Sequence, residues 1–308
     1  MNLAILFWFY KEPEICQNRL ELIRKYNPTI PIYGLYGGDL STVEQYKVSL
    51  GKYLDDFYVF TGNQDSQWKW LQGDLLLTDW YLKRGKNLTW DTVVVVQWDM
   101  LVFGEIEKLF SMLKKDEILL SGLRPIKEVE KDWMWVTPKI PDHRQQYLTF
   151  LEYVQKTYNY KLDPLGCIFI VICLPRVFLD KYSTVQQPEL GFLEYRIPMY
   201  AQIFGIPFCE NHPFNAWWLD CDSLYNHNKQ PIKRFLNTLR SKFNSPSLSA
   251  SRTNVSLISI FRQLNSQRGA RIFHPYQHLI PLRNGQWLSA FFKEWRRDLN
   301  WLNKKFSR

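Results

Sequence analysis

Residues 92–96 form the most restrictive segment of the sequence, because all five are β-branched: Thr92 is followed by four valines. Such residues favour extended backbone, and a run without polar alternation is typical of a strand that is buried on both faces. A strand of this kind lies inside a sheet whose two faces are covered by helices. Gln97, Trp98 and Asp99 follow directly, so the sequence predicts a carboxylate at the carboxyl end of a central strand.

The rest of the N-terminal half alternates between strand-like and helix-like patterns. The expected strands are residues 3–10, 30–36, 57–60 and 117–121, and the expected helices are 14–26, 68–84 and 106–113. This alternation predicts an α/β fold with a mostly parallel central sheet flanked by helices. Ligands of such sheets bind beyond the carboxyl ends of the strands. The residues after Tyr10, Tyr36 and Val96 are therefore the first candidates for a site.

The second half of the chain is less regular. Residues 127–143 are rich in charge, Trp and Pro and are expected to form a loop over the active site, and residues 227–256 are expected to form a loop or linker. Helices are predicted at 145–158 and at 189–204, where Pro198 should kink or split the helix. Strands are predicted at 166–174, 206–209 and 271–273, and an aromatic, basic amphipathic helix at 286–308.

Charge and composition narrow the class of partner. The formal net charge of +9 attracts anions such as nucleic acid, acidic lipid or phosphorylated ligands. The basic residues are spread along the chain without a nucleic-acid-binding motif, so no nucleic acid partner is expected. Aromatic residues make up 16% of the chain, most of them expected in the core and a few in a ligand site. No Walker loop or Gly-x-Gly-x-x-Gly fingerprint occurs.

The cysteines and the apolar N-terminal run bear on the compartment. The chain has five cysteines and no Cys-x-x-Cys pair, which disfavours a disulfide framework or a zinc knuckle. Residues 3–10 lack the basic flank and cleavage site of a signal peptide and are too short to span a bilayer. We therefore expect a cytoplasmic protein.

Asp99 is the strongest candidate for chemistry. A carboxylate at the end of a buried strand is costly unless it has a partner. A divalent cation is a suitable partner, because Mg²⁺ and Mn²⁺ prefer oxygen ligands and accept phosphate oxygens beside them. The alternative is that Asp99 only caps the turn that follows the strand.

With this residue in place, the layout resembles the glycosyltransferases of the GT-A fold. In that family a strand ends in an Asp-x-Asp motif that holds Mn²⁺ or Mg²⁺ against the diphosphate of a nucleotide-sugar donor. Gln97-Trp98-Asp99 looks like this motif, with Gln97 in place of the first acid. The resemblance implies a metal at Asp99, a UDP- or GDP-sugar donor, and donor contacts from Gln97 and Trp98.

Further elements match the family in the same order along the chain. Gly166, before an apolar run, resembles the glycine that approaches the donor sugar. Glu194 resembles the acidic residue that faces the acceptor and acts as general base in inverting members. Glu189 is its rival, and pairing of Glu194 with Arg196 or a nearby Lys is the alternative. His274, between a short strand and a proline, resembles the late histidine ligand of the metal.

His212 is the runner-up for the histidine ligand. At the ends of the first two strands, Phe9 and Tyr10 are expected to stack on the nucleotide base. Asp39 is expected to accept a hydrogen bond from a uracil or guanine edge.

The resemblance also gives the organisation and the function. It implies a GT-A-like domain at residues 1–285, with a donor half of about 1–125 and an acceptor half of about 126–285, followed by the helix at 286–308. The expected activity is hexosyl-type transfer to a hydroxyl of a glycan, lipid-linked or small-molecule acceptor. The alternative is a non-catalytic nucleotide-sugar or glycan binding module. The terminal helix either packs on the domain or binds an anionic membrane on its inner face, which would make the protein peripheral.

Overall fold

A computed structural model describes residues 1–210, 255–267 and 269–306 of the chain. His212 and residues 227–254 of the predicted loop lie outside the described residues. Within them, the predicted α/β fold with a mostly parallel sheet flanked by helices is confirmed.

The central sheet has six strands in the order β3-β2-β1-β4-β9-β6. They are β1 (Leu3–Phe9), β2 (Ile32–Tyr36), β3 (Asp56–Val59), β4 (Thr92–Gln97), β6 (Leu119–Leu120) and β9 (Ile172–Pro175). β1, β2, β3 and β4 run parallel, whereas β9 pairs antiparallel with both β4 and β6. The valine run is β4, which lies inside the sheet as predicted. β1 continues to β2 on one side and has β4 on the other, so a topological switch point lies at the ends of β1 and β4.

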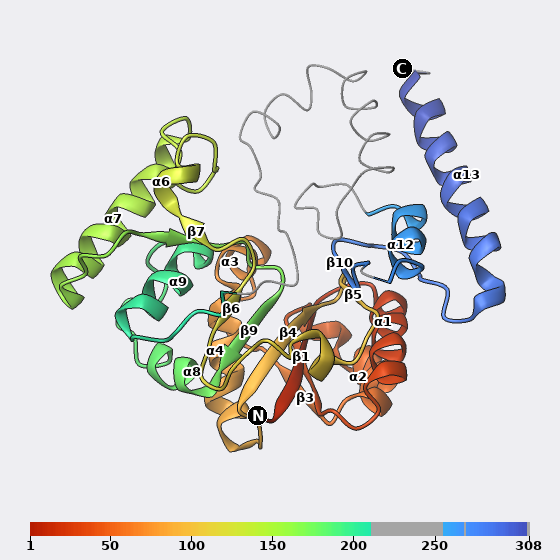
Figure 1. Cartoon of the computed structure of the whole chain (residues 1–308), viewed down its shortest axis with the longest axis horizontal. Coiled ribbons are helices and arrows are strands. Elements are labelled where there is room, and N and C mark those ends of the chain that lie inside the picture. The colour runs from red at the N-terminus through yellow and green to blue at the C-terminus, as the bar shows by residue number, and fades with distance from the viewer. Residues whose placement is uncertain (211–254, 268, 307–308) are drawn as a thin grey trace.

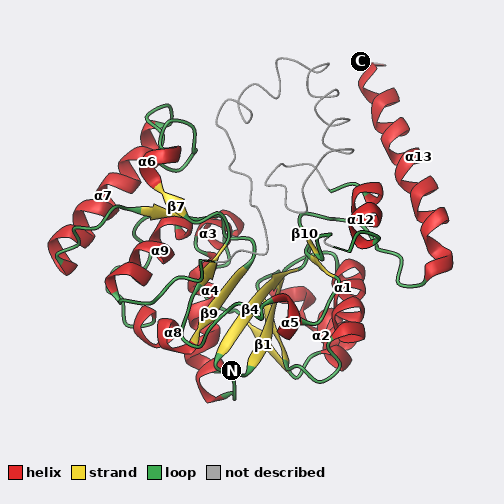
Figure 2. Ribbon diagram, viewed as in Figure 1, coloured by secondary structure: helices red, strands yellow, loops and turns green. Residues whose placement is uncertain are grey.

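Helices cover both faces of the sheet (Figures 1 and 2). Successive side chains of β1 point to opposite faces, so Leu6 and Trp8 join one core cluster, and Phe7 and Phe9 join the other. The first cluster includes α4 (Gly73–Lys83), α8 (Arg176–Tyr182) and α9 (Leu193–Ile203). The second includes α1 (Pro13–Tyr26), α2 (Val43–Leu50) and α5 (Ile106–Leu109). The apolar strands are thus buried on both sides.

Smaller elements surround this core. Two short antiparallel pairs are β5 (Leu101–Val102) with β10 (Ile272–Phe273), and β7 (Arg124–Pro125) with β8 (Leu165–Gly166). The remaining helices of the described residues are α3 (Ser66–Leu71), α6 (Ile126–Val129), α7 (Pro141–Tyr158), α12 (Leu257–Leu264) and α13 (Trp287–Phe306). The short 3-10 helices are η1 (Leu40–Thr42), η2 (Gly51–Tyr53), η3 (Gly85–Asn87) and η5 (Asn284–Gln286).

The prediction of a single helix at 68–84 is wrong, because the structure has two helices there, α3 and α4, separated at Gln72. Gly73 packs against the indole of Trp8: a Cβ at this position would lie 2.3 Å from the ring. The break lets the backbone approach the end of β1 closely. Arg84 caps the end of α4, and Gly85 begins η3.

The strand predicted at 166–174 is interrupted between β8 and β9. In this gap, backbone N–H groups that would bond to a neighbouring strand in a continuous sheet donate to side-chain oxygens instead. Val171 donates its N–H to the Ser121 hydroxyl at 3.0 Å, and Phe169 donates its N–H to a carboxylate of α9. The predicted strand at 206–209 is reduced to a bridge between Ile118 and Phe208. Pro198 does not split α9, which runs through it.

The C-terminal part forms its own apolar cluster with α1. Side chains of α12, β5, β10 and the start of α13 pack together, including Leu257, Phe273 and Phe291. Arg19 of α1 is fully buried and donates to the carbonyls of Tyr276 and His278, at 2.6 Å each. No helix in the described part of the chain is long and apolar enough to cross a membrane.

Candidate functional site

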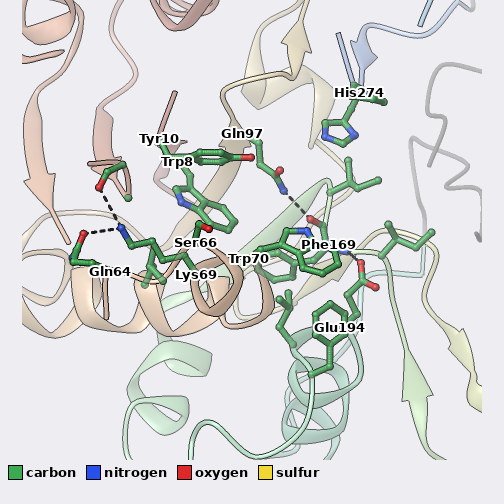
Figure 3. Close-up of a pocket in the computed structure, with 18 of the residues that line it drawn as sticks. Trp8, Tyr10, Gln64, Ser66, Lys69, Trp70, Gln97, Phe169, Glu194 and His274 are labelled. Atoms are coloured by element: carbon green, nitrogen blue, oxygen red, sulfur yellow. Dashed lines mark hydrogen bonds between the residues drawn. The ribbon is translucent and has the colours of Figure 1, made fainter. Parts of the chain in front are cut away.

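A cavity of about 920 Å³ lies beyond the carboxyl ends of β1, β2 and β4, at the switch point of the sheet. Its wall combines rings, backbone and a few polar groups (Figure 3). The lining residues used below are Trp8, Tyr10, Gly38, Asp39, Gln64, Lys69, Trp70, Gln97, Met134, Trp135, Phe169, Phe192, Glu194 and His274. Residues 127–143, predicted as a loop over the site, contribute Met134 and Trp135.

The sheet connections bring Asp99 and His274 together from positions far apart in the sequence. Asp99 lies in the turn after β4, two residues before β5, and His274 directly follows β10. Because β5 pairs with β10, the two residues meet, and the His274 Nε2 lies 3.3 Å from the Asp99 Oδ1. The N–H of Tyr276 donates to the Asp99 carbonyl at 2.8 Å, which fixes the turn further. The predicted pairing of these two residues in space is therefore present.

The Asp99 carboxyl is buried but ionises readily. Burial acts to raise its pKa, but the His274 imidazole and the Gln277 amide more than offset this, and the pKa lies below its ordinary value. Gln277 donates to Asp99 Oδ2 at 3.4 Å, whereas the buried Oδ1 has no hydrogen-bond donor with good geometry. Asp99 lies behind His274, since His274 lines the cavity and Asp99 does not.

The Asp99–His274 pair fits a divalent cation. Two ligands bound at about 2.1 Å in neighbouring positions around such an ion lie about 3 Å apart, close to the separation here. The unsatisfied Asp99 Oδ1 and the His274 Nε2 are an oxygen and a nitrogen donor of the kinds that Mn²⁺ accepts. In the described part of the chain no group of three His, Cys, Asp or Glu side chains gathers.

Glu194, in the first turn of α9, lines the cavity. Its Oε1 accepts the N–H of Phe169 at 2.8 Å. Burial raises its pKa to about 7, against the opposing effect of hydrogen bonds from Phe169 and Trp135. A carboxyl that exchanges its proton near neutral pH, on the wall of a cavity, has the properties of a general acid or base.

The alternatives for Glu194 do not hold in the structure. Arg196 is directed to the buried Asp74, with Nη2 and Oδ1 2.5 Å apart, and does not pair with Glu194. The rival acid Glu189 is exposed, accepts the indole N–H of Trp68 at 3.2 Å, and does not line the cavity.

The backbone of Phe169 connects Glu194 to Gln97. The N–H of Phe169 donates to Glu194, and its carbonyl accepts the Gln97 amide at 2.8 Å (Figure 3). A carboxylate at position 97 would be repelled by this carbonyl, whereas an amide donates to it. Gln97 therefore suits the backbone beside it and still lines the cavity.

Three of the predicted donor contacts lie elsewhere. Phe9 is fully buried among the rings of the core, and Trp98 is 1% exposed and also in the core, so neither is placed to stack on a ligand. Gly166 faces Trp133, whose ring would lie 2.5 Å from a Cβ, and it does not line the cavity. Phe9, Trp98 and Gly166 therefore contribute to packing and do not line the cavity.

Tyr10 and Asp39 do line the cavity. Tyr10 is 42% exposed, and its ring meets Trp98 edge-on. Asp39 Oδ1 accepts both the N–H and the hydroxyl of Ser41, at 2.9 Å each, and caps η1. These hydrogen bonds lower the pKa of Asp39 and keep it charged.

Sequence reasoning missed several lining residues. Trp8, Lys69, Trp70, Trp135 and Phe192 all face the cavity. Trp8 differs from the predicted Phe9 by one position, and the alternation of side chains along β1 decides which of them reaches the ligand side. Lys69 and Trp70 belong to α3, which ends at the break at Gln72, so the direction of their side chains does not follow from the pattern of one continuous helix.

The sequence matches no protein-family model and no curated protein sequence. Among solved structures, it is similar to the galactosyltransferase LgtC in complex with donor and acceptor sugar analogues, at 13% identity and a TM-score of 0.41, over 89% of this chain and 87% of that chain. An active-site mutant of LgtC matches at 12% identity and a TM-score of 0.43, over 93% and 94% of the two chains. At this level the likeness carries no residue roles to this chain.

Proposed function

We propose that this chain is a glycosyltransferase of the GT-A type that transfers a sugar from a nucleoside diphosphate donor to an acceptor hydroxyl. The observation that carries the proposal is that two acids in contrasting states lie at the switch point of the sheet, Glu194 on the cavity wall and Asp99 behind the lining residue His274. Glu194 has a pKa of about 7, while Asp99 is ionised beside His274. In enzyme sites, two acids whose environments give them different pKa values typically take different roles. One exchanges a proton, and the other stays charged and stabilises charge electrostatically.

The donor nucleotide is assigned to the end of the cavity formed by Gly38, Asp39 and Lys69. The Lys69 ammonium donates to the Gly38 carbonyl at 3.2 Å and to Gln64 Oε1 at 2.8 Å. A lysine has three donors, which leaves one for a phosphate oxygen. Both hydrogen bonds from Ser41 go to Asp39 Oδ1, and Oδ2 is assigned to an N–H of uracil or guanine, with the Tyr10 ring against the base.

Asp99 and His274 would hold Mn²⁺ or Mg²⁺. Such an ion supplies positive charge that stabilises the departing nucleoside diphosphate. Without the first acid of the motif, the protein contributes the Asp99 oxygen and the His274 nitrogen, and Gln97 is left to orient Phe169.

Glu194 is assigned to the acceptor. In an inverting reaction its carboxylate takes the proton of the attacking hydroxyl, and in a retaining reaction it orients that hydroxyl. The N–H of Phe169 holds Oε1 of this carboxylate in place, and the acceptor hydroxyl is assigned to Oε2.

A thermal-shift screen tests the donor site. UDP, GDP, CDP and dTDP are each added with and without Mn²⁺, because a ligand that binds only the folded state raises its stability. We expect one nucleotide to stabilise the protein in a Mn²⁺-dependent way, and Asp99→Ala to lose this effect while remaining folded. Absence of any shift with all four nucleotides would contradict the proposal.

The alternative is a non-catalytic module that binds a nucleotide-sugar or a glycan. It predicts a nucleotide-dependent shift without turnover of any sugar donor. The raised pKa of Glu194 favours the enzyme, because a binding module does not need a carboxyl that titrates near neutral pH.

Helix α13 is proposed to bind an anionic membrane surface, which would place the protein at the inner face of the membrane. Leu288, Phe292 and Trp295 recur at spacings of four and three residues and are 67%, 58% and 60% exposed. On the adjoining face, Trp287 and Phe291 pack against Phe261 of α12. The exposed basic residues beside the apolar stripe, such as Lys293 and Arg296, suit acidic headgroups.

Flotation with vesicles of phosphatidylcholine and phosphatidylserine tests this surface. We expect binding to fall when Phe292→Ser and Trp295→Ser are combined, since each removes exposed apolar surface without touching the packed face. Undiminished flotation of this variant, or no flotation of the intact chain, would reject the membrane role.

A further inference from the structure

Trp70 is unusually exposed for a large ring on a cavity wall. It belongs to α3, lines the cavity, and is 58% exposed. An indole buries a large apolar area when it finds a partner, so its exposure at a concave site indicates that a ligand covers it.

Two further rings back Trp70. Trp135 and Phe192 are stacked, with ring centroids 3.6 Å apart and an interplanar angle of 26°. The Trp70 ring lies 5.4 Å from Trp135 and 6.4 Å from Phe192, tilted to both. Trp135 and Phe192 are 6% exposed each, so this pair is a rigid support and Trp70 is the open member of the wall. The three rings are called the aromatic wall below.

The aromatic wall adjoins Glu194. Phe192 precedes Glu194 by two residues, and Trp135 donates a hydrogen bond to the Glu194 carboxyl. In Figure 3, Trp70 and Glu194 lie toward the same end of the cavity, while Lys69 and Gln64 lie toward the other. Lys69 and Trp70 are neighbours on α3, but Lys69 lies toward the donor end of the cavity and Trp70 toward the end at Glu194.

A pyranose ring matches this surface. It has one face of C–H groups, which packs on an aromatic ring, and a rim of hydroxyl groups that need hydrogen-bond partners. The rings of the aromatic wall provide the first requirement, and the Glu194 carboxyl provides an acceptor for one hydroxyl.

We propose that Trp70, supported by Trp135 and Phe192, binds a pyranose ring of the acceptor, so that the acceptor of this chain is a saccharide. This inference rests on the proposed function and adds the class of acceptor. Stacking on Trp70 fixes the ring, and the hydroxyl at its rim that reaches Glu194 is the one to be glycosylated.

The test measures saccharide binding without turnover. Methyl β-D-galactopyranoside, methyl β-D-glucopyranoside and methyl β-lactoside are titrated into the UDP-bound or GDP-bound full chain, and saturation-transfer NMR reads which protons touch the protein. Trp70→Ala is compared with Trp70→Phe, which keeps a ring. Trp295→Ala removes a tryptophan of similar exposure on α13 and is the matched control.

We expect at least one glycoside to bind through the protons of one ring face. Its affinity should fall about tenfold in Trp70→Ala, less in Trp70→Phe, and stay unchanged in Trp295→Ala. Nucleotide affinity should be the same in all four proteins, because Trp70 is assigned to the acceptor.

Equal glycoside affinity in Trp70→Ala and the wild type, or nucleotide binding with no glycoside binding, would overturn the inference and leave the proposed function standing. Glycoside binding that depends on Trp70, with no nucleotide binding by any variant, would support the saccharide subsite and contradict the proposed function. A loss of nucleotide affinity in Trp70→Ala would place the ring at the donor and overturn the assignment to the acceptor.

Discussion

Glu194 lines the cavity and Asp99 contacts its lining residue His274, and the surroundings of these two acids shift their pKa values in opposite directions. Asp99 is beside an imidazole and an amide, which favour its charged form and lower its pKa. Glu194 is among rings and accepts hydrogen bonds from neutral donors, so burial raises its pKa to about 7. Since both residues are largely buried, the difference shows that the nature of the neighbours, rather than depth, decides which acid holds charge and which exchanges a proton.

The two regions are also built differently. The Asp99 region depends on the pairing of β5 with β10 and on Arg19 of α1, which holds the carbonyls after His274. The Glu194 region depends on the interrupted strand at Phe169 and on Arg196, which binds Asp74 in the core. Each acid can therefore be altered with little effect on the other, and this separation makes the comparison testable.

The largest expected effect is that of Asp99→Ala on transfer. Removing the charge that supports the leaving diphosphate should lower kcat/KM by about 10³-fold or more. Circular dichroism should show an unchanged fold. Turnover like that of the wild type in this variant would remove Asp99 from the mechanism.

Glu194→Gln should lower kcat by on the order of 10²-fold to 10³-fold, because the amide does not take a proton. The donor should still bind, in contrast to Asp99→Ala. The wild-type rate should fall as the pH drops below about 7, where Glu194 becomes protonated, and this acid limb should be absent from the residual activity of the variant. An identical acid limb in both proteins would assign the titration to another group.

The pH dependence of the free energy of unfolding should also separate the two regions. Because the pKa of Glu194 is raised from 4.5 to about 7 on folding, the native state binds the proton more tightly than the unfolded state. This contribution to stability is present below pH 4.5 and is lost as the pH rises toward 7. At pH 8, Glu194→Gln should therefore be more stable than the wild type by up to about 3 kcal/mol, with little difference at pH 4. Urea denaturation at the two pH values measures this, and an unchanged difference between them would contradict the raised pKa.

The smallest effect is expected for Lys69→Met at the donor end. Loss of one charged hydrogen bond to phosphate should weaken nucleoside diphosphate binding about tenfold, and the affinity for the nucleoside alone should not change. Titration calorimetry with UDP or GDP and with the matching nucleoside distinguishes the two. An equal loss for both ligands would point to a structural role of Lys69.

The fold was predictable where a residue pattern has one physical solution. The valine run had to be an inner strand, and the alternation with helices gave the parallel sheet and its ligand-binding edge. The break at Gln72 was not predictable, because it follows from the contact of Gly73 with Trp8 across the fold. The gap before β9 likewise depends on the distant partners Ser121 and Glu194.

Site residues followed the same division. The positions of Asp99, Glu194 and His274 were predictable because each stands at the end or start of an element, where the sheet topology fixes its position. Phe9 and Trp98 were misplaced because a ring at a strand end is apolar on either side, and the sequence does not reveal which side is core. Trp70 was missed because its exposure is a property of the folded cavity.

The most direct test of the account is release of nucleoside diphosphate from a panel of UDP- and GDP-sugars, measured with Mn²⁺ and with the methyl glycosides as acceptors. The wild type should release nucleotide from one donor in an acceptor-dependent way, and Glu194→Gln should bind that donor and fail to release it. Tight donor binding by the wild type without release from any donor would contradict the transferase assignment and establish a binding module.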